Sequence, residues 1–334
     1  MIREKVKELW KLCFNDSEEF IDMYFRLRYN NDVNLAIQSG EEVIAALQML
    51  PYPMTFGEAE INTAYISGAC THPDFRNRGV MHELLSQAFT RMLHNDVVLS
   101  TLIPAEPWLF SYYARNGYAP IFNRSKSTVP ASAVPLPKAG YTLKVTHEYK
   151  ADTYQYLNRK LKERPYCIQH TEKDFHVILS DLQLSRGSIF ELNHGGAIVA
   201  LAIAYPTDTN QWYVEEIVSD TPDMASLLLQ RICSRLKLPS IEVANATGQP
   251  LGMARIINAK AILQLYAAAH PELETSIYLS DEEVNANNGY YYLNNGKCMN
   301  SAKRLPGSHL ALTIGELTEK VFASSVPCMS LMLN

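Results

Sequence analysis

The spacing of apolar side chains predicts a layered α/β domain in the first third of the chain. The clearest element lies in residues 81–93, where apolar residues recur at i, i+3, i+4, i+7 and i+8, as in a helix with one buried face. Upstream, Asp16 and Glu19 have the spacing of a capping box ahead of another helical pattern. The remaining predicted elements are strands at 34–38, 43–50, 64–71 and 97–102, and a helix from Pro107 to Gly117.

A second α/β pattern follows the proline-rich segment 125–140, which we interpret as a linker. The stretches ISGACTHPDFRNRGVMHELLSQAF and VEEIVSDTPDMASLLLQRICSRL align by eye, and the second lacks the Arg and Gly of the first. A duplicated fold with one chemically emptied loop is the simplest explanation. The predicted elements are helices at 151–162, 171–184, 224–236, 254–269 and 317–322, and strands at 188–192, 197–205, 212–218, 240–243, 275–279, 289–293 and 310–313.

Composition and charge narrow the classes of function. The chain has 334 residues, of which 47% are hydrophobic and 19% charged, so we expect a folded globular protein of about two domains. Its net charge is −5 and it has no Lys/Arg block, which argues against a nucleic-acid partner. The longest apolar stretch, 197–205, is far shorter than the roughly 20 residues of a membrane span. With no secretory segment at the N-terminus, a cytoplasmic location is expected.

The cysteines are widely spaced along the chain. No two form a C-x-x-C pair, and no His follows at the spacing of a zinc site, so we expect no metal centre. The pattern indicates reduced, mostly buried thiols rather than a disulfide framework. The positions concerned are Cys13, Cys70, Cys167, Cys233, Cys298 and Cys328.

The stretch THPDFRNRGVM, residues 71–81, contains the most informative chemistry. A predicted strand leads into it and an amphipathic helix leads out, so its end offers the unpaired N–H groups of a helix N-terminus. Gly79 permits close backbone approach, and Arg76 and Arg78 supply charge-assisted donors. The arrangement suits a pyrophosphate, although a solvated basic turn ahead of a helix has the same sequence pattern.

This loop resembles the acyl-CoA loop of the GCN5-related N-acetyltransferase (GNAT) superfamily, whose pattern is Arg/Gln-x-x-Gly-x-Gly/Ala. Arg76 and Gly79 match it, whereas Met81 departs at the last position. Downstream, FSYYARNGY is similar to that superfamily's F-Y-x-x-x-G-[FY] signature, with Tyr113, Gly117 and Tyr118 at the matching positions. Two motifs in the right order are more specific than either alone.

Length and domain order resemble the Eis ("enhanced intracellular survival") branch, whose members often carry a bulky residue where Met81 stands. The resemblance implies an α/β fold of tandem GNAT-like domains, the second degenerate, followed by an α+β domain similar to a sterol-carrier protein (SCP2-like). The stretch from Met253 to Leu293 is similar to the start of that third domain. The expected boundaries are a catalytic domain at 1–124, a linker at 125–140, a degenerate domain at 141–248 and the SCP2-like domain at 249–334.

The resemblance implies an N-acetyltransferase that moves an acetyl group from the co-substrate acetyl-CoA to a primary amine in a ternary complex. Backbone of the third strand would bind the acyl carbonyl and pantetheine, with the loop on the pyrophosphate. Tyr113 would act as general acid, and the α-carboxylate of Asn334 as base. The acceptor would be a small molecule or a peptide, and the protein a homo-oligomer, hexameric in the best-known cases. The donor-binding positions are Ala69, Cys70, Thr71, Arg76, Asn77, Arg78, Gly79, Val80 and Met81.

Several residues have a second interpretation. Tyr113 lies on an apolar helix face and suits a core position. Cys70 suits a small apolar filler, and a covalent acyl-cysteine route is the alternative. His72 competes with Asn334 as the base, and the apolar tail could simply pack. The aromatic residues Trp10, Tyr24, Phe25, Tyr52 and Trp108 fit either an acceptor pocket or the core. The alternative function is a non-catalytic CoA- or lipid-binding sensor.

Overall fold

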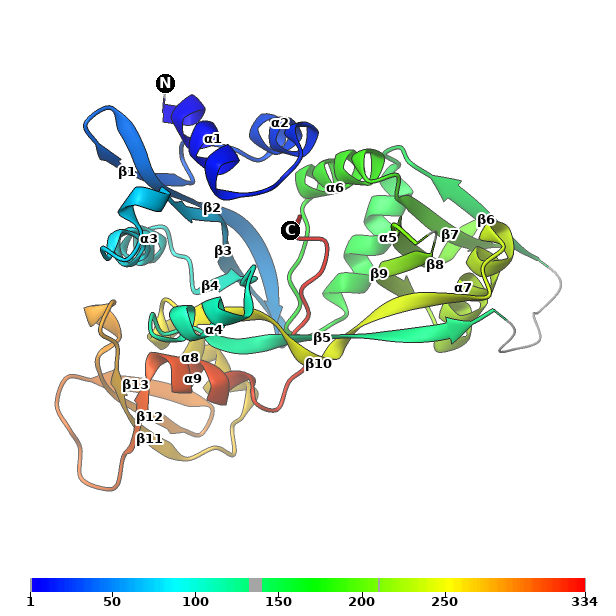
Figure 1. Cartoon of the computed structure of the whole chain (residues 1–334). Helices are drawn as coiled ribbons and strands as arrows, with labels where there is room; N and C mark the ends of the chain where they lie inside the picture. Colours follow the sequence, from blue (N-terminus) through cyan, green and yellow to red (C-terminus); the bar gives the residue numbers. More distant parts are fainter. Residues whose placement is uncertain (1, 132–139, 210, 334) are drawn as a thin grey trace. The chain divides into compact units, whose positions relative to one another are not determined.

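The computed structural model describes residues 2–131, 140–209 and 211–333, and the chain divides into two compact units (Figure 1). Unit 1 consists of Met1–Phe122 and Pro250–Pro327, and unit 2 of Asn123–Gln249 and Cys328–Asn334. This division differs from the predicted domains at the C-terminal end. The predicted third domain, 249–334, is divided between unit 1 and unit 2. No helix in the described ranges is long and apolar enough to cross a membrane.

Unit 1 contains a mixed sheet between helices. Strand β1 (Asn34–Ser39), β2 (Glu42–Phe56) and β3 (Ala59–Thr71) are antiparallel neighbours, and β3 pairs in parallel with β4 (Leu99–Leu102). The end of β10 (Ser240–Ile256) runs antiparallel to β4. Helices that pack against these strands or follow them are α1 (Ile2–Cys13), α2 (Glu18–Leu27), α3 (Val80–His94) and α4 (Pro107–Ala114).

The amphipathic pattern of α3 produces the main core of unit 1. Leu84, Leu85 and Phe89 are fully buried against alternate residues of β2, of which Leu47 is 1% exposed. Alternate residues of a strand point to opposite faces, so one face of β2 packs on α3 while α1 packs on β2 and β3 from the other. The predicted helix at 81–93 is confirmed, with its start at Val80.

The predicted capping box at Asp16 is wrong by one residue. Helix α2 begins after Ser17, whose side chain accepts a hydrogen bond from the N–H of Phe20 at 3.2 Å. The Asp16 carboxylate instead accepts from the Trp10 indole N–H at 2.8 Å. A local pattern therefore located the helix start, but a contact from α1 decided which residue serves as the cap.

Two other predicted boundaries are also wrong. Residues 125–130 are not linker but the end of β5 (Ala119–Pro130), which pairs with β10, and residues 132–139 of the predicted linker lie outside the described part. The predicted helix 254–269 begins only at Ala259, because β10 runs to Ile256 and Asn258 caps α8 (Ala259–Ala269). Such strands are defined by hydrogen bonds to a neighbouring strand, and the sequence alone does not show which strand that neighbour is.

The C-terminal part of unit 1 is a four-stranded sheet in the order β13-β12-β11-β14 (Figure 1, orange and red). The strand β13 was not predicted. The likeness of this α+β part to a sterol-carrier fold stays a prediction. Its elements are β11 (Thr275–Ser280), β12 (Gly289–Asn294), β13 (Lys297–Ser301), β14 (Leu310–Thr313) and α9 (Ile314–Phe322), with α8 ahead of them.

Unit 2 repeats the element order of the N-terminal part. Two helices, an antiparallel three-stranded run, a helix and a parallel strand follow one another in both segments. In β8, Leu201 and Ile203 face one core while Ala200 and Ala202 face another, so both sides of the sheet are covered. The elements are β6 (Tyr141–Thr146), α5 (Ala151–Lys162), α6 (Glu172–Leu184), β7 (Ser188–His194), β8 (Ala197–Pro206), β9 (Trp212–Ser219), α7 (Pro222–Leu236) and the start of β10.

A disulfide joins Cys167 to Cys328 in unit 2, so the expectation of six reduced thiols is wrong. The partners are 161 residues apart in the sequence, a separation that spacing alone could not pair. The bond holds the C-terminal tail, in which Leu331 and Met332 are buried. Asn334 lies outside the described residues.

Candidate active site

The loop between β3 and α3 is built largely by backbone. His72 caps a single 3-10 turn (Pro73–Phe75), and its Nδ1 accepts a hydrogen bond from the N–H of Asp74 at 3.3 Å. This contact gives the imidazole a structural role at the end of β3, and it engages the ring nitrogen in the loop itself. The turn directs the chain into the residues that precede α3.

Helix α3 begins at a glycine with a left-handed backbone. Gly79 has φ +77°, and no side chain in the described part of the chain caps the helix there. A Cβ on Gly79 would meet nothing within 4 Å, so the space over this helix end is open. Asn77 also has a positive φ, +60°, so two residues of this short loop have left-handed backbone. The first turn of α3 therefore presents unsatisfied donors with a partial positive charge.

Two exposed guanidinium groups border this helix end. Arg76 Nε donates to the carbonyl oxygen of Thr71 at 3.1 Å, and the Arg78 guanidinium carbon lies 5.3 Å from the centre of the Phe75 ring. Both contacts orient the side chains without neutralising their charge. A strand end, a left-handed glycine and two arginines together have the chemistry that binds oxyanions.

The corresponding helix of unit 2 has a different N-terminus. Helix α7 is preceded by Thr221, whose side chain accepts from the N–H of Met224, and Pro222 removes another donor. In α7 one N–H of the first turn is thus capped by a side chain and another donor is absent, whereas α3 has no side-chain cap among the described residues. This difference agrees with the sequence-based interpretation that the second loop has lost its chemistry.

Strand β3 separates from β4 beside this loop. The parallel pairing covers Thr63 to Tyr65 only, and within the described residues Ile66–Thr71 has no strand partner on that side. On its other side β3 carries a bulge, where the register with β2 shifts between Ser67 and Cys70. The free edge includes the backbone of Ala69, Cys70 and Thr71, the predicted donor-binding segment.

The bulge depends on Gly68. A Cβ at this position would lie 2.1 Å from the Trp10 ring, and its φ is +60°. The Trp10 ring therefore packs directly on the bulged backbone, and Tyr24 supports the same place by donating a hydrogen bond to Ser67 Oγ at 2.7 Å. These aromatic residues are core: Trp10, Tyr24, Phe25 and Tyr52 are at most 5% exposed, whereas Trp108 is 66% exposed.

Tyr113 lies on α4 and is 7% exposed. Burial raises the pKa of its phenol, with smaller contributions from the electrostatic effects of Tyr112 and Cys70. Among residues 2–131, 140–209 and 211–333, no hydrogen-bond partner is found for its hydroxyl. A buried phenol that stays protonated and has no partner is a proton donor available to a ligand.

The rest of the second motif has a structural role. Gly117, at φ +78°, ends α4, and the N–H of Tyr118 bonds the carbonyl of Tyr113 at 3.1 Å. A Cβ on Gly117 would lie 2.5 Å from Ile314. The Tyr118 hydroxyl is paired with Ser100 Oγ at 2.6 Å, in contrast to that of Tyr113. The motif therefore fixes the helix end that orients Tyr113.

Several of the predicted residues lie together in unit 1, where Ala69, Val80 and Met81 pack against the core cluster that includes Tyr113. Cys70 and Tyr113 interact electrostatically, and Arg76 bonds Thr71 at the end of the free edge. Met81, the position that departs from the GNAT pattern, packs with Val80 against the core below α3, so its bulk does not fill the loop. No cluster of three or more His, Cys, Asp or Glu side chains that could hold a metal occurs among the described residues.

Sequence reasoning did not assign Cys13 to this site. Its Sγ lies 3.4 Å from the carbonyl oxygen of Thr71 and 4.0 Å from Arg76 Nη2. Cys13 ends α1, far from the loop in the sequence, and no motif includes it. Only the packing of α1 on β3 brings it here.

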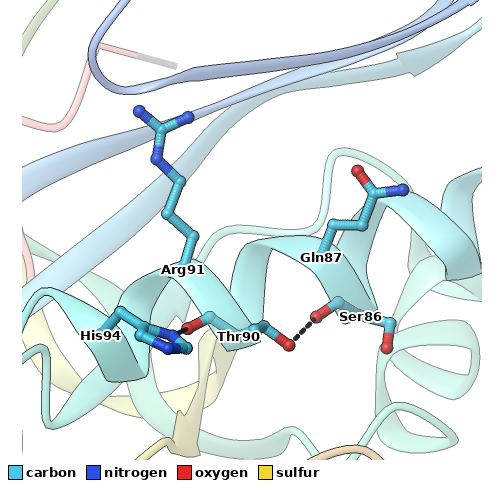
Figure 2. A pocket seen from close by; sticks show the side chains of 5 residues that line it. All are labelled: Ser86, Gln87, Thr90, Arg91 and His94. Atoms are coloured by element: carbon cyan, nitrogen blue, oxygen red, sulfur yellow. Dashed lines mark hydrogen bonds between the residues drawn. The ribbon is translucent and has the colours of Figure 1, made fainter.

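A surface depression on α3 is separate from these residues. Figure 2 shows that its five side chains all belong to this helix, with Thr90 donating to Ser86 O and His94 bonded to Thr90 O. None of the predicted site residues lines it. The lining residues are Ser86, Gln87, Thr90, Arg91 and His94.

Comparison with known proteins agrees with this geometry. Residues 3–121 match the family model described as an acetyltransferase (GNAT) domain. No curated protein sequence matches the chain significantly. The segment that matches contains the loop, the free edge of β3 and Tyr113.

Solved structures resemble the chain over nearly its whole length. A probable N-acyltransferase from Enterococcus faecalis V583 has a TM-score of 0.75 at 16% identity and covers 95% of this chain and 86% of its own. A GCN5-related N-acetyltransferase from Anabaena variabilis ATCC 29413 has a TM-score of 0.75 at 14% identity, with 97% and 94% covered. Eis1 from Mycobacterium abscessus has a TM-score of 0.73 at 12% identity, with 95% and 86% covered. At such identities the likeness shows a shared fold, and residues 3–121 are the part that matches the GNAT acetyltransferase family in sequence.

Proposed function

We propose that this protein transfers an acetyl or other short acyl group from acyl-CoA to a primary amine. The observation that carries the proposal is Tyr113, whose side chain is buried, whose pKa is raised by burial and whose hydroxyl has no partner in the described residues. Tyr113 belongs to the core cluster against which Ala69 of β3 and Val80 of α3 pack. The match of residues 3–121 to a GNAT acetyltransferase domain supports acyl transfer in general.

The residues present fit an acyl-CoA donor. Its diphosphate would accept hydrogen bonds from the N–H groups of Gly79, Val80 and Met81, while Arg76 and Arg78 offset its charge. The backbone of Asn77 contributes through its left-handed turn. The amide groups of the pantetheine arm would complete the unpaired edge of β3 at Ala69, Cys70 and Thr71, as an added strand does.

The proposed reaction is direct aminolysis of the thioester. The amine nitrogen attacks the acyl carbon, the C–N bond forms, and the C–S bond breaks with its electron pair on sulfur. Tyr113 donates its proton, or a hydrogen bond, to the departing thiolate. The raised pKa of Tyr113 suits this role, because the phenol remains a donor throughout the neutral range.

The proton of the attacking ammonium needs a base. Our candidate is the α-carboxylate of Asn334, which lies outside the described residues. His72 is the weaker candidate because its Nδ1 already accepts the Asp74 N–H. Adding residues after Asn334 should lower kcat and leave the acetyl-CoA Kd unchanged; full activity of the extended chain would exclude the carboxylate.

The activity itself is tested by thiol release from acetyl-CoA with a panel of primary amines. We expect turnover with at least one amine class and a calorimetric Kd for acetyl-CoA without any acceptor. Acetyl-CoA binding with no turnover on any amine would favour a non-catalytic sensor instead. Absence of binding would refute both.

A further inference from the structure

His82, in the first turn of α3, makes a hydrogen bond to the end of α4. Its Nδ1 lies 2.9 Å from Oδ1 of Asn116, a residue just beyond the last turn of that helix. Asn116 Nδ2 donates to the carbonyl oxygen of Tyr112 at 2.9 Å. The amide oxygen of Asn116 is therefore the group that faces the ring, and the hydrogen of this bond belongs to His82 Nδ1.

The other ring nitrogen of His82 faces a carboxylate. Nε2 lies 3.4 Å from Glu283 Oε1, and the side chain of Glu283 is 13% exposed, whereas the imidazole is 57% exposed. With its hydrogen on Nδ1, a neutral ring directs the lone pair of Nε2 toward Glu283, so only the imidazolium donates to both partners. The bond to Asn116 is therefore the one that His82 keeps in both of these protonation states.

Both partners of His82 are held by one buried arginine. Arg255 Nε donates to the carbonyl oxygen of Asn116 at 2.9 Å, and Arg255 Nη2 donates to Asp281 Oδ1 at 2.6 Å. The same carboxylate oxygen accepts a hydrogen bond from the N–H of Glu283 at 3.0 Å. Because Arg255 and Asp281 are buried, His82 binds from the surface to two groups that the interior already fixes.

The turn that His82 contacts carries the candidate acid. The N–H of Asn116 donates to the carbonyl oxygen of Tyr113 at 2.9 Å. Tyr113 also belongs to the core cluster against which Val80, the first residue of α3, packs. The bond from His82 to Asn116 therefore ties the helix that begins at the candidate oxyanion site to the turn that carries Tyr113.

We propose that His82 is a positioning residue for the acyl transfer: through Asn116 it fixes the last turn of α4 and so directs the Tyr113 hydroxyl toward the thioester. The inference rests on the proposed function, because it adds a residue to the same site. The hydroxyl has no hydrogen-bond partner in the described part of the chain, so packing and the backbone set its direction. A displacement of about 1 Å in such a position costs up to about 100-fold in rate.

A second histidine on α3 provides a matched control. His94 is also exposed, but its Nδ1 is bonded to the carbonyl oxygen of Thr90 in the same helix (Figure 2). This bond joins no second element. His94→Ala therefore removes an imidazole from α3 without touching the end of α4.

Two variants of similar size separate the contacts of His82. In His82→Asn the amide nitrogen can take the place of Nδ1 and keep the bond to Asn116, whereas in His82→Gln it takes the place of Nε2 and that bond is lost. With acetyl-CoA and an accepted amine, kcat of His82→Asn should stay within about threefold of the wild type, and kcat of His82→Gln and His82→Ala should fall by about 10–100-fold. The calorimetric Kd for acetyl-CoA should stay within about twofold in all three variants. His94→Ala should behave as the wild type.

A second measurement follows Tyr113 without any substrate. The full chain is labelled with 3-fluorotyrosine at position 113 only, and the ¹⁹F resonance is recorded for each variant. The wild type and His82→Asn should share one shift and line width, whereas His82→Gln should shift or broaden the resonance. Thermal unfolding of the same samples should give Tm values within about 2 °C, because the substituted side chain is exposed.

The inference is overturned if the Asn and Gln variants have equal kcat at equal Tm, if the acetyl-CoA Kd rises as kcat falls, or if the ¹⁹F resonance is the same in both. If acetyl-CoA does not bind and no amine is turned over, the proposed function fails, and the resonance still decides whether His82 orients Tyr113. If the wild type turns over and His82→Gln keeps its kcat, the positioning role fails alone. The Asn and Gln variants decide the question even where His82→Ala fails to fold.

Discussion

Tyr113→Phe separates catalysis from stability. The substitution removes a hydroxyl that has no hydrogen-bond partner among the described residues, so no contact is lost and the free energy of unfolding should stay constant or rise by up to about 1 kcal/mol. A proton donor in the transition state contributes about 10²–10⁴-fold to rate, so kcat should fall by that factor, which is about 3–5 kcal/mol of barrier. The acetyl-CoA Kd should remain within about twofold, because the loop before α3 is untouched.

Tyr118→Phe is the matched control. Its hydroxyl pairs with Ser100 Oγ at 2.6 Å, and both groups are buried. Removal leaves the Ser100 hydroxyl unsatisfied and should lower the free energy of unfolding by about 1–3 kcal/mol. For a folding unit of about 200 residues this lowers Tm by roughly 2–4 °C per kcal/mol. Both variants delete a tyrosine hydroxyl oxygen. Tyr118→Phe should lower Tm, whereas Tyr113→Phe should leave Tm unchanged or raise it.

The assay pair is thiol release under saturating acetyl-CoA and thermal unfolding at the same pH. Because burial raises the pKa of Tyr113 above the ordinary value of about 10, the wild type should keep its acid through neutral and mildly alkaline pH. Any loss of kcat between about pH 7 and 9 must then come from another group. The reasoning is refuted if Tyr113→Phe keeps wild-type kcat, or if it loses activity only because it is less stable than Tyr118→Phe.

Four other predictions concern separate contacts. Gly117→Ala should lower the free energy of unfolding by about 2 kcal/mol or more, because its Cβ would lie 2.5 Å from Ile314. Gly57 also has a positive φ but has open space around it, so Gly57→Ala should lower the free energy of unfolding by only about 1 kcal/mol. Chemical denaturation measures both changes. Asp281→Asn leaves the charge of the fully buried Arg255 unpaired and should lower the free energy of unfolding by about 3–5 kcal/mol. Glu4→Gln, in the exposed pair with Arg3, should lower it by less than about 1 kcal/mol. Equal losses would contradict the burial argument. Arg76→Gln should weaken acetyl-CoA binding by roughly 10–100-fold in calorimetry, while Arg26→Gln on α2 should not. Cys328→Ser should lower the unfolding free energy of unit 2 by about 2–5 kcal/mol, and an unchanged Tm would show that the tail is held by packing alone.

The sequence predicted well wherever the cause is local. The helix of residues 81–93 is predicted by the apolar period of its own sequence. In the loop ahead of it, Arg76 and Gly79 are residue types that indicate oxyanion binding. The limits of α4 were also predicted, because Pro107 at its start and Gly117 just after its end act on the backbone next to them. The order of elements in both halves follows from the same short-range signals.

Features that depend on distant partners were missed. Part of strand β5 was predicted as linker, because its polar sequence has no strand pattern of its own and it forms a strand by pairing with β10. The Cys167–Cys328 disulfide joins residues that no spacing rule connects. Cys13 entered the site through Gly68, which lets Trp10 and therefore α1 approach β3. In each case the information lies in which surfaces meet, and a single sequence does not state that.

The family match ends at residue 121, but the folding unit that holds the site does not. Arg255, from β10, is fully buried; its guanidinium donates to the carbonyl of Asn116 at the end of α4 and to Asp281 at 2.6 Å. Its guanidinium carbon also lies 4.3 Å from the centre of the Phe89 ring on α3. Residues 250–327 thus brace both helices that border the site. A chain cut after Phe122 would expose the Phe89 face and lose the support of α4, so the orientation of Tyr113 depends on a segment that the GNAT match does not include.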